Sequence, residues 1–300
     1  MMKLPVNSEN FKEIVLEKIR TYCDTNIWPF EYDYFAAWLN NFDCPIEEYL
    51  ALQMLDNLIV RSNEMARSSY SRLINCEILS LLNERKVVEN LSIWKWKERL
   101  KSGALNGIIR FCPVKLKNDQ GESGGVIYRL MSQQLNTDRY AFSKAQNPPR
   151  VIILVDDFIG SGDQFKDFAK EFNLSEKLEK SIVIYCPLIA FEDGIIEVSK
   201  EFENLVILPC EKIYRNDGFF FGEDNDSFKN DQQNTHKEVK DFFFNMKEKY
   251  GKDISNWFGY KDAALPLAFE WGCPNQTPAV LYMDYSKQRK GWNKLFSRRA

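Results

Sequence analysis

One segment, Val151 to Gln164, limits most strongly what this chain can fold into. It reads VIILVDDFIGSGDQ. Five apolar, mostly β-branched residues predict a strand that is buried on both faces. This strand runs into two adjacent carboxylates, Asp156 and Asp157, and a Gly-Ser-Gly turn follows. Apolar residues then recur at the spacing of a helix face, at Phe165, Phe168, Ala169 and Phe172. Strand, acidic pair, turn and helix in this order are typical of the ligand-binding edge of an open α/β sheet.

The turn itself is suited to a phosphate. Gly160 and Gly162 permit close backbone approach and a positive φ angle. The first N–H groups of the next helix have no partner inside that helix, so they are available to an anion. The segment is neither a P-loop nor a dinucleotide fingerprint, because Gly-Lys-Ser/Thr and G-x-G-x-x-G are both missing. A strand that ends in Asp before a Gly-rich turn also occurs in many α/β proteins with other functions.

The segment resembles the loop that binds 5-phosphoribosyl 1-pyrophosphate (PRPP) in type I phosphoribosyltransferases. The resemblance implies that Asp156 and Asp157 hold the ribose hydroxyls. It also implies a loop around the 5′-phosphate, made of Gly160, Ser161, Gly162, Asp163 and Gln164. Two positions depart from the family: Gln164 replaces a usual Thr or Ser, and Asp163 adds a carboxylate that would repel a phosphate. Alternatively, Asp163 caps the following helix, where Asp is favoured.

Composition excludes several classes of protein. The net charge of −3 gives no global sign of a nucleic-acid surface. The seven cysteines form no C-x-x-C motif, which favours reduced thiols in a cytoplasmic protein. No apolar leader or membrane span is expected. The only histidine, His236, lies in a polar stretch, which argues against His-rich metal sites and Ser-His-Asp triads.

The first 100 residues are predicted to be mostly helical. Pro45 marks a helix start, with Glu47 and Glu48 in its first turn, and the apolar pattern is expected to continue the helix through Leu58 and Ile59. A later apolar series predicts another helix, at Leu73, Ile78, Leu79 and Leu82. This region is interpreted as a helical bundle packed on the sheet, with a DNA-binding head as the alternative.

From Gly107 onward, strands and helices alternate. Strands are expected at Gly107–Val114, Ser181–Ala190 and Val206–Leu208, with a helix at Phe191–Phe202. Such alternation predicts βαβ units and a parallel sheet. Between the first strand and the central one, Ser123, Gly124 and Gly125 open a helix after a polar loop at Lys115–Glu122. The phosphoribosyltransferase resemblance implies that these three residues bind pyrophosphate, with Arg129 as a nearby cation; a turn capped by Ser123 is the alternative.

The chain beyond residue 210 is less regular. A long polar loop is expected at residues 211–237, with three phenylalanines that either close over a ligand or pack on the helical region. Lys212 and Arg215 are candidates to reach pyrophosphate. A helix is expected at Val239–Tyr250, and a strand after a turn at Pro274–Pro278. The tail from Ser286 is basic, with Lys287, Arg289, Lys290, Lys294, Arg298 and Arg299. Such a tail is either a solvated end or a contact for nucleic acid or a partner protein.

Three features together resemble a narrower family. They are the DDFIGSGDQF loop, the Pro-Asn-Gln-Thr segment with a downstream Trp292-to-Phe296 motif, and the Trp38-to-Phe42 region. The family is PRTase-CE, the phosphoribosyltransferase-like domain of bacterial conflict systems. It implies a role in anti-phage defence beside partner proteins, including retron reverse transcriptases. By the same resemblance Asn275 and Thr277 are candidate site residues, although Pro, Asn and Thr are also ordinary turn formers.

The resemblance implies a type I phosphoribosyltransferase-like α/β fold: a parallel sheet flanked by helices, with a helical N-terminal region at residues 1–100 and the α/β domain at residues 101–300. The expected activity is transfer or hydrolysis at C1 of the ribose of PRPP, with Mg²⁺ bound through the phosphates and the Asp156–Asp157 pair. Two alternatives stay open. One is a subunit that senses PRPP or a nucleotide without chemistry, and the other is a protein- or nucleic-acid-contacting subunit of a defence complex.

Overall fold

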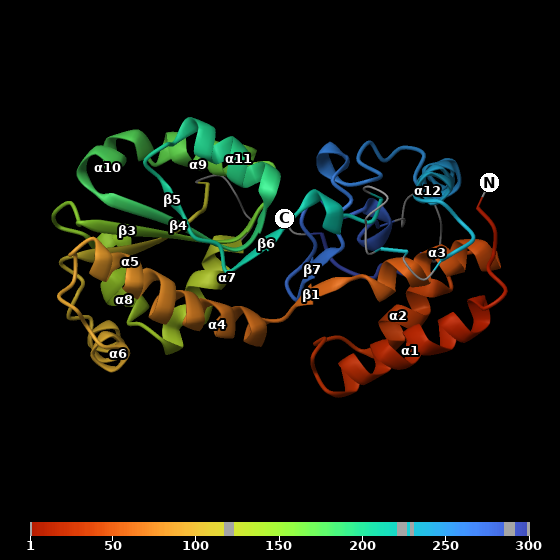
Figure 1. Cartoon of the computed structure of the whole chain (residues 1–300), viewed down its shortest axis with the longest axis horizontal. Helices are drawn as coiled ribbons and strands as arrows, with labels where there is room; N and C mark the ends of the chain where they lie inside the picture. Colours follow the sequence, from red (N-terminus) through yellow and green to blue (C-terminus); the bar gives the residue numbers. More distant parts are fainter. Residues whose placement is uncertain (1, 117–122, 221–226, 229–230, 285–291, 299–300) are drawn as a thin grey trace. The chain divides into compact units, whose positions relative to one another are not determined.

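The computed structural model describes residues 2–116, 123–220, 227–228, 231–284 and 292–298. The chain forms two compact units (Figure 1). Unit 1 takes the chain up to Ser62 and again from Tyr214, and unit 2 takes Asn63–Ile213. This division differs from the boundary expected near residue 100. The physical reason is a pairing across the chain: strand β1 (Ile59–Arg61) lies parallel to strand β7 (Leu267–Phe269).

Unit 1 is built mainly from helices. They are α1 (Ser8–Asp24), α2 (Tyr32–Leu39), α3 (Pro45–Asp56) and α12 (His236–Tyr250). Helix α3 starts at Pro45, as predicted, but it ends at Asp56, so the expected continuation through Ile59 is wrong. The N–H of Ile59 instead donates to the carbonyl of Pro266 at 2.6 Å, which opens the β1–β7 ladder. Tertiary pairing here overrides an apolar helical pattern.

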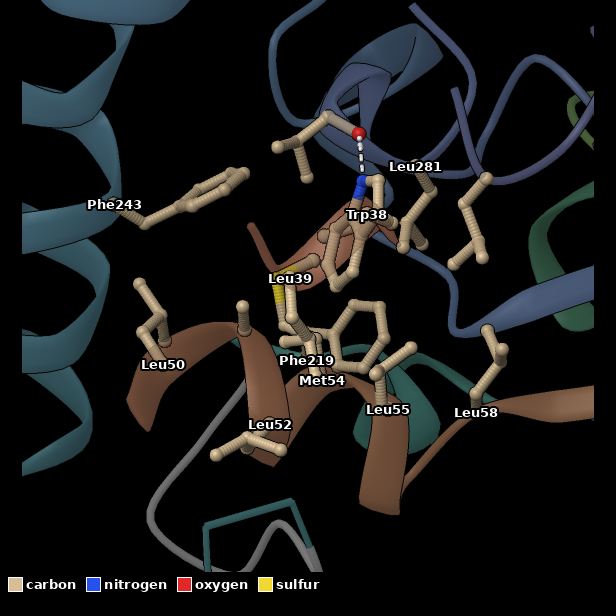
Figure 2. Close-up of a cluster of buried hydrophobic side chains, with 14 of the residues drawn as sticks. Trp38, Leu39, Leu50, Leu52, Met54, Leu55, Leu58, Phe219, Phe243 and Leu281 are labelled. Carbon is tan, nitrogen blue, oxygen red and sulfur yellow. Dashed lines mark hydrogen bonds between the residues drawn. The ribbon is translucent and has the colours of Figure 1, made fainter. Parts of the chain in front are cut away.

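One hydrophobic core joins the two chain segments of unit 1. Figure 2 shows side chains from α2 and α3 packed against Phe219, Phe243 and Leu281. The indole Nε1 of Trp38 donates a hydrogen bond of 3.0 Å to the carbonyl of Val280 (Figure 2). A buried indole N–H needs such an acceptor, so this bond fixes the C-terminal segment on α2.

Two expectations for this part of the chain are corrected. The residues after Pro278 form a 3₁₀ turn at Ala279–Leu281 instead of a strand, because the N–H of Ala279 donates to Trp257 and the segment folds onto the core. The start of the expected loop forms strand β6 (Glu211–Ile213). Phe219 and Phe220 are buried in the unit 1 core, in agreement with the packing interpretation. The third phenylalanine, Phe221, lies outside the described residues.

Unit 2 contains the parallel sheet that the sequence predicts. Its strands are β2 (Ile109–Pro113), β3 (Val151–Ile159), β4 (Ile182–Phe191), β5 (Val206–Ile207) and β6. Their order is β2-β3-β4-β5, and β6 pairs with β4 beyond the end of β5. All these pairs are parallel, and β3 and β4 are buried almost throughout. The apolar run of β3 therefore forms a central strand, as both-face burial requires.

Helices cover both faces of this sheet. They are α4 (Asn63–Arg72), α5 (Leu79–Glu84), α6 (Ile93–Ser102), α7 (Ser123–Leu130), α8 (Thr137–Tyr140), α9 (Asp163–Glu171), α10 (Leu174–Lys180) and α11 (Glu192–Glu201). Helices α9, α10 and α11 lie on one face of the sheet, and α4 and α5 lie on the other (Figure 1). The predicted fold class, a parallel sheet flanked by helices with a helical N-terminal region, is confirmed. No helix in the described part of the chain combines the length and apolarity needed to cross a bilayer.

The shared core of unit 1 makes a prediction about stability. Leu55 of α3 and Leu281 of the C-terminal segment are both fully buried in it. We expect Leu55→Ala and Leu281→Ala each to lower the free energy of unfolding by about 2–5 kcal/mol, because each leaves a cavity in one core. Urea denaturation followed by tryptophan fluorescence measures this. The matched control is Ile14→Ala, on the exposed side of α1, with an effect within about 0.5 kcal/mol. A neutral Leu281→Ala variant would contradict a shared core.

Candidate functional site

The candidate site begins where β3 ends. Asp156 and Asp157 lie in the second half of β3 and are 5 % and 0 % exposed. Side chains alternate along a strand, so Asp156 shares the face of Ile152 and Leu154, which pack beneath α9 and α11. This alternation does not persist to the end of β3, because Ile159 packs in the same cluster as Ile152 and Leu154. Asp157, the next residue along the strand, is fully buried.

Asp156 is held by two donors. The N–H of Asp157 donates to its Oδ1 at 3.0 Å, and the hydroxyl of Tyr185 donates to its Oδ2 at 2.8 Å. Burial and the charge of Asp156 raise the pKa of Tyr185 well above its ordinary value, so this hydroxyl remains a donor. The ring of Phe165, in the first turns of α9, stacks on the Tyr185 ring with centroids 4.1 Å apart. The helix after the turn is thereby fixed to β4, whose Tyr185 hydroxyl binds the carboxylate of Asp156 on β3.

A second tyrosine approaches the same point from α4. The hydroxyl of Tyr70 lies 2.7 Å from the carbonyl oxygen of Asp156 and 2.6 Å from that of Cys186. The register pairs Asp156 with Pro187, which has no N–H to offer to the ladder. Tyr70 brings a donor to the place where the ladder lacks one. Sequence reasoning missed both tyrosines; the signal was a proline within the apolar run of a central strand, a rare position.

The turn has the geometry that its glycines suggested. Gly162 adopts φ +83°, and it is the N-cap residue of α9, so the prediction that Asp163 caps this helix is wrong. Asp163 is instead the first residue of α9, where the helix dipole favours an acid. Its Oδ2 accepts a hydrogen bond of 2.8 Å from the Ser161 hydroxyl. Asp163 and Gln164 are both exposed, and Gly160 is buried against Gly194 of α11.

The second predicted loop lies beside the first strand of the sheet. Helix α7 starts at Ser123, and a Cβ atom on Gly124 would lie 2.4 Å from the carbonyl oxygen of Val114. Val114 follows β2 directly, and its N–H donates to Val155 of β3. The opening of α7 therefore lies at the carboxyl end of β2, next to that of β3. The side chain of Ser123 and residues 117–122 lie outside the described residues.

A cation accompanies the opening of α7. The Nη1 atom of Arg129 lies 3.7 Å from the position that a Cβ on Gly125 would take. The guanidinium is therefore folded back over the first turn of its own helix. Arg129 therefore lies beside Gly125 of the predicted pyrophosphate loop.

The chain leaves β2 and β3 toward different layers. Helix α7, after β2, contacts α4, whereas α9, after β3, contacts α11. These helices cover opposite faces of the sheet (Figure 1). In open α/β sheets, ligands bind in the crevice where two adjacent connections diverge in this way. The acidic pair, the Gly160–Gln164 turn and the start of α7 all belong to this edge of the sheet.

The remaining predicted site residues belong to other segments of the chain. Asn275 and Thr277 belong to unit 1. The Thr277 side chain is fully buried, and its hydroxyl donates to the carbonyl of Leu267 at 2.6 Å. The Oδ1 of Asn275 accepts from Arg298 at 3.1 Å. In unit 1 these two residues therefore organise the turn that follows β7. Lys212 is exposed on β6, and Arg215 is exposed in unit 1. Most of the basic tail lies outside the described residues.

The geometry of the strand ends in unit 2 indicates a broad class of α/β domain. A parallel α/β unit with an acidic pair and a glycine turn at a divergent strand edge is an arrangement found in many nucleotide- and phosphate-binding domains. The PRTase-CE family model matches residues 35–298, and the chain belongs to this family. No curated protein matches the chain.

The backbone of the turn yields a prediction. We expect Gly162→Ala to lower the free energy of unfolding by about 1–2 kcal/mol, because an L-residue is strained at this positive φ. A Cβ there would also press on Cγ2 of Val198, at 3.1 Å. The control is Gly107→Ala, at a glycine of unit 2 whose Cβ would meet no atom within 4 Å. Guanidinium denaturation measures both variants, and equal stabilities would contradict the strained turn.

Proposed function

We propose that unit 2 binds PRPP or a related ribose-5-phosphate nucleotide and promotes transfer or hydrolysis at C1 of the ribose. The observation that carries this proposal is the edge of the sheet at β2 and β3, where the acidic pair, the Gly160–Gln164 turn and the opening of α7 come together. Membership of the PRTase-CE family supports it.

In this proposal each group has a physical role. The N–H groups at the start of α9 bind the 5′-phosphate, since they lack partners within the helix. The carboxylates of Asp156 and Asp157 bind the ribose hydroxyls and favour the positive charge that develops on the ribose as pyrophosphate leaves. The N–H groups of Gly124 and Gly125 receive the pyrophosphate, with Arg129 as the neighbouring cation.

Mg²⁺ accompanies the ligand in this proposal. Among the described residues no group of three or more His, Cys, Asp or Glu side chains forms a metal site. Mg²⁺ in proteins commonly uses one or two carboxylates and the phosphates of the substrate, and the Asp156–Asp157 pair fits that pattern. When bound, the ion neutralises charge on the departing phosphates.

A second candidate function is binding without chemistry. Two observations favour it: the Asp156 carboxylate already accepts hydrogen bonds from Tyr185 and the Asp157 N–H, and an additional acid, Asp163, stands at the phosphate turn. A carboxylate there weakens phosphate binding. Formation of pyrophosphate from PRPP by the purified chain would exclude this candidate.

We expect the native chain to bind PRPP with Mg²⁺ in calorimetry and an Asp156→Asn, Asp157→Asn double variant to bind about 10–100-fold more weakly, because two charged acceptors are lost. Asp163→Asn should bind up to about fivefold more tightly, since about 1 kcal/mol of repulsion is removed.

The matched control is Asp167→Asn, at an exposed residue of α9 that pairs with Lys170 on the surface. Its affinity for PRPP should equal that of the native chain. The double variant changes two buried residues, so its fold is checked by circular dichroism. Asp163→Asn, at an exposed position, tests the same site without that risk. Unchanged affinity in both variants would contradict the proposed site.

The biological setting is also part of the proposal. Membership of PRTase-CE supports a role in anti-phage defence together with a partner protein such as a retron reverse transcriptase. We expect cells that carry the native chain with its genetic neighbours to resist phage, and cells with the Asp156→Asn, Asp157→Asn variant to lose that resistance. Phage plating efficiency measures this, with Asp167→Asn as the control. Equal plating on native and empty-vector cells would exclude the defence role.

A further inference from the structure

Unit 2 has a pocket at the amino ends of its strands, opposite to the candidate site at their carboxyl ends. Its volume is 420 Å³. The lining includes Asn106, Gly107, Arg110, Arg139, Lys144 and Asn147. Gly107 precedes β2 and Asn147 precedes β3, so the pocket lies at the amino ends of these strands. Arg110 is paired in register with Ile152, four residues before Asp156, which puts the two sites about 13 Å apart along the strand.

Arg110 is an unusual residue for a buried position in a strand. It is 9 % exposed and stands in β2, the second residue of that strand. Its Nη1 donates to the carbonyls of Arg139 and Ala141, at 2.8 and 3.3 Å. In the described part of the chain no carboxylate pairs with this guanidinium. A buried cation without a counter-charge is unfavourable, and two backbone carbonyls satisfy only two of its five N–H donors.

The other two cations of the pocket each have one partner in the described part of unit 2. Nη1 of Arg139 donates to the carbonyl of Ser102 at 2.9 Å, and its side chain lies against Gly103. Gly103 has φ +77°, and a Cβ there would lie 2.5 Å from Cδ of Arg139. Lys144 forms an ion pair with Asp138, the one carboxylate among the residues that line the pocket. Three cationic side chains thus face one acid.

We propose that this pocket is a second anion site, specific for a phosphoryl dianion such as inorganic phosphate or the phosphate group of a nucleoside monophosphate. A phosphoryl group carries about −1.5 to −2 charges at neutral pH, which matches the excess of cations better than a carboxylate does. Arginine forks bind phosphate oxygens in pairs. The amides of Asn106 and Asn147 add neutral donors at the rim. The volume lies within the range of small-molecule pockets, roughly 300–1,000 Å³.

The site is independent of the proposed PRPP site. Its residues come from the segment before β2, the start of β2, helix α8 and the segment between α8 and β3. None of them belongs to the acidic pair, the glycine turn or α7. A ligand here contacts β2 and the segment that leads into β3, at the ends opposite to the two candidate loops. It therefore binds the native state only and stabilises unit 2 by mass action.

The test is a calorimetric titration of the full chain with inorganic phosphate and, separately, with AMP, at low salt. Arg110→Met and Gly107→Leu should each weaken binding about 10–100-fold, the first by removing a charged donor and the second by filling the pocket. Gly107→Leu keeps every hydrogen bond, and its side chain enters space with no atom within 4 Å of the Cβ. It therefore tests the pocket even if Arg110→Met fails to fold.

Two controls separate this site from the other one. Arg150→Gln removes an exposed cation outside the pocket and should leave phosphate affinity unchanged. The Asp156→Asn, Asp157→Asn double variant should also retain it. Because AMP and phosphate can also bind at the proposed PRPP site, the comparison uses only the binding that Gly107→Leu removes. If AMP binds there more tightly than phosphate, a monoester is the ligand, and equal affinities identify the phosphate group alone. The proposal is overturned if the native chain does not bind either probe, or if Gly107→Leu binds both as well as the native chain.

Discussion

The architecture of unit 2 depends on how a missing backbone hydrogen-bond donor in its central sheet is replaced. Pro187 stands opposite Asp156 in β4 and offers no N–H to the ladder. Two tyrosine hydroxyls reach this point from different elements: Tyr70 of α4 binds backbone carbonyls, and Tyr185 of β4 binds the Asp156 carboxylate. Both tyrosines are fully buried. Their hydroxyls satisfy polar groups that would otherwise be costly to bury.

The hydrogen bonds of these two tyrosines determine the position of the candidate site. The hydroxyl of Tyr185 binds the Asp156 carboxylate, and the ring of Tyr185 stacks on the ring of Phe165. The same residue therefore positions both the acidic pair and the helix after the turn. On the other side of the turn, Gly194 of α11 lets the backbone of Gly160 approach closely. An edge supported in this way is organised in the absence of ligand, and such preorganisation would lower the entropic cost of the proposed binding.

The sequence was most informative where local pattern and tertiary structure agree. The buried run of Val151–Val155, the Gly160–Gly162 turn and the helix after it follow directly from residue types, and the strand, turn and helix form as predicted. The PRTase-CE resemblance was also confirmed. Whether Asp156 and Asp157 bind a ribose stays a prediction.

Long-range pairing is what sequence periodicity could not reveal. Ile59 continues an apolar helical pattern, yet it pairs with Leu267, more than 200 residues away. Tyr70 looks like an ordinary helix residue, and its partner carbonyls lie 86 and 116 residues further along the chain. The role of Arg110 could not be predicted from the sequence either. It depends on the carbonyls and the pocket around the guanidinium, which are brought together only by the fold.

The discontinuity of unit 1 has a consequence for biosynthesis. Helices α1, α2 and α3 leave the ribosome early, but their apolar faces pack on residues that follow unit 2 in the chain. Translation at roughly 5–20 residues per second leaves these faces uncovered for about ten seconds or more. During that interval unit 2, whose segments are contiguous, can fold on its own. The nascent helices of unit 1 are therefore the natural clients of a chaperone, and a chain that stops before Leu281 leaves them as an aggregation-prone fragment.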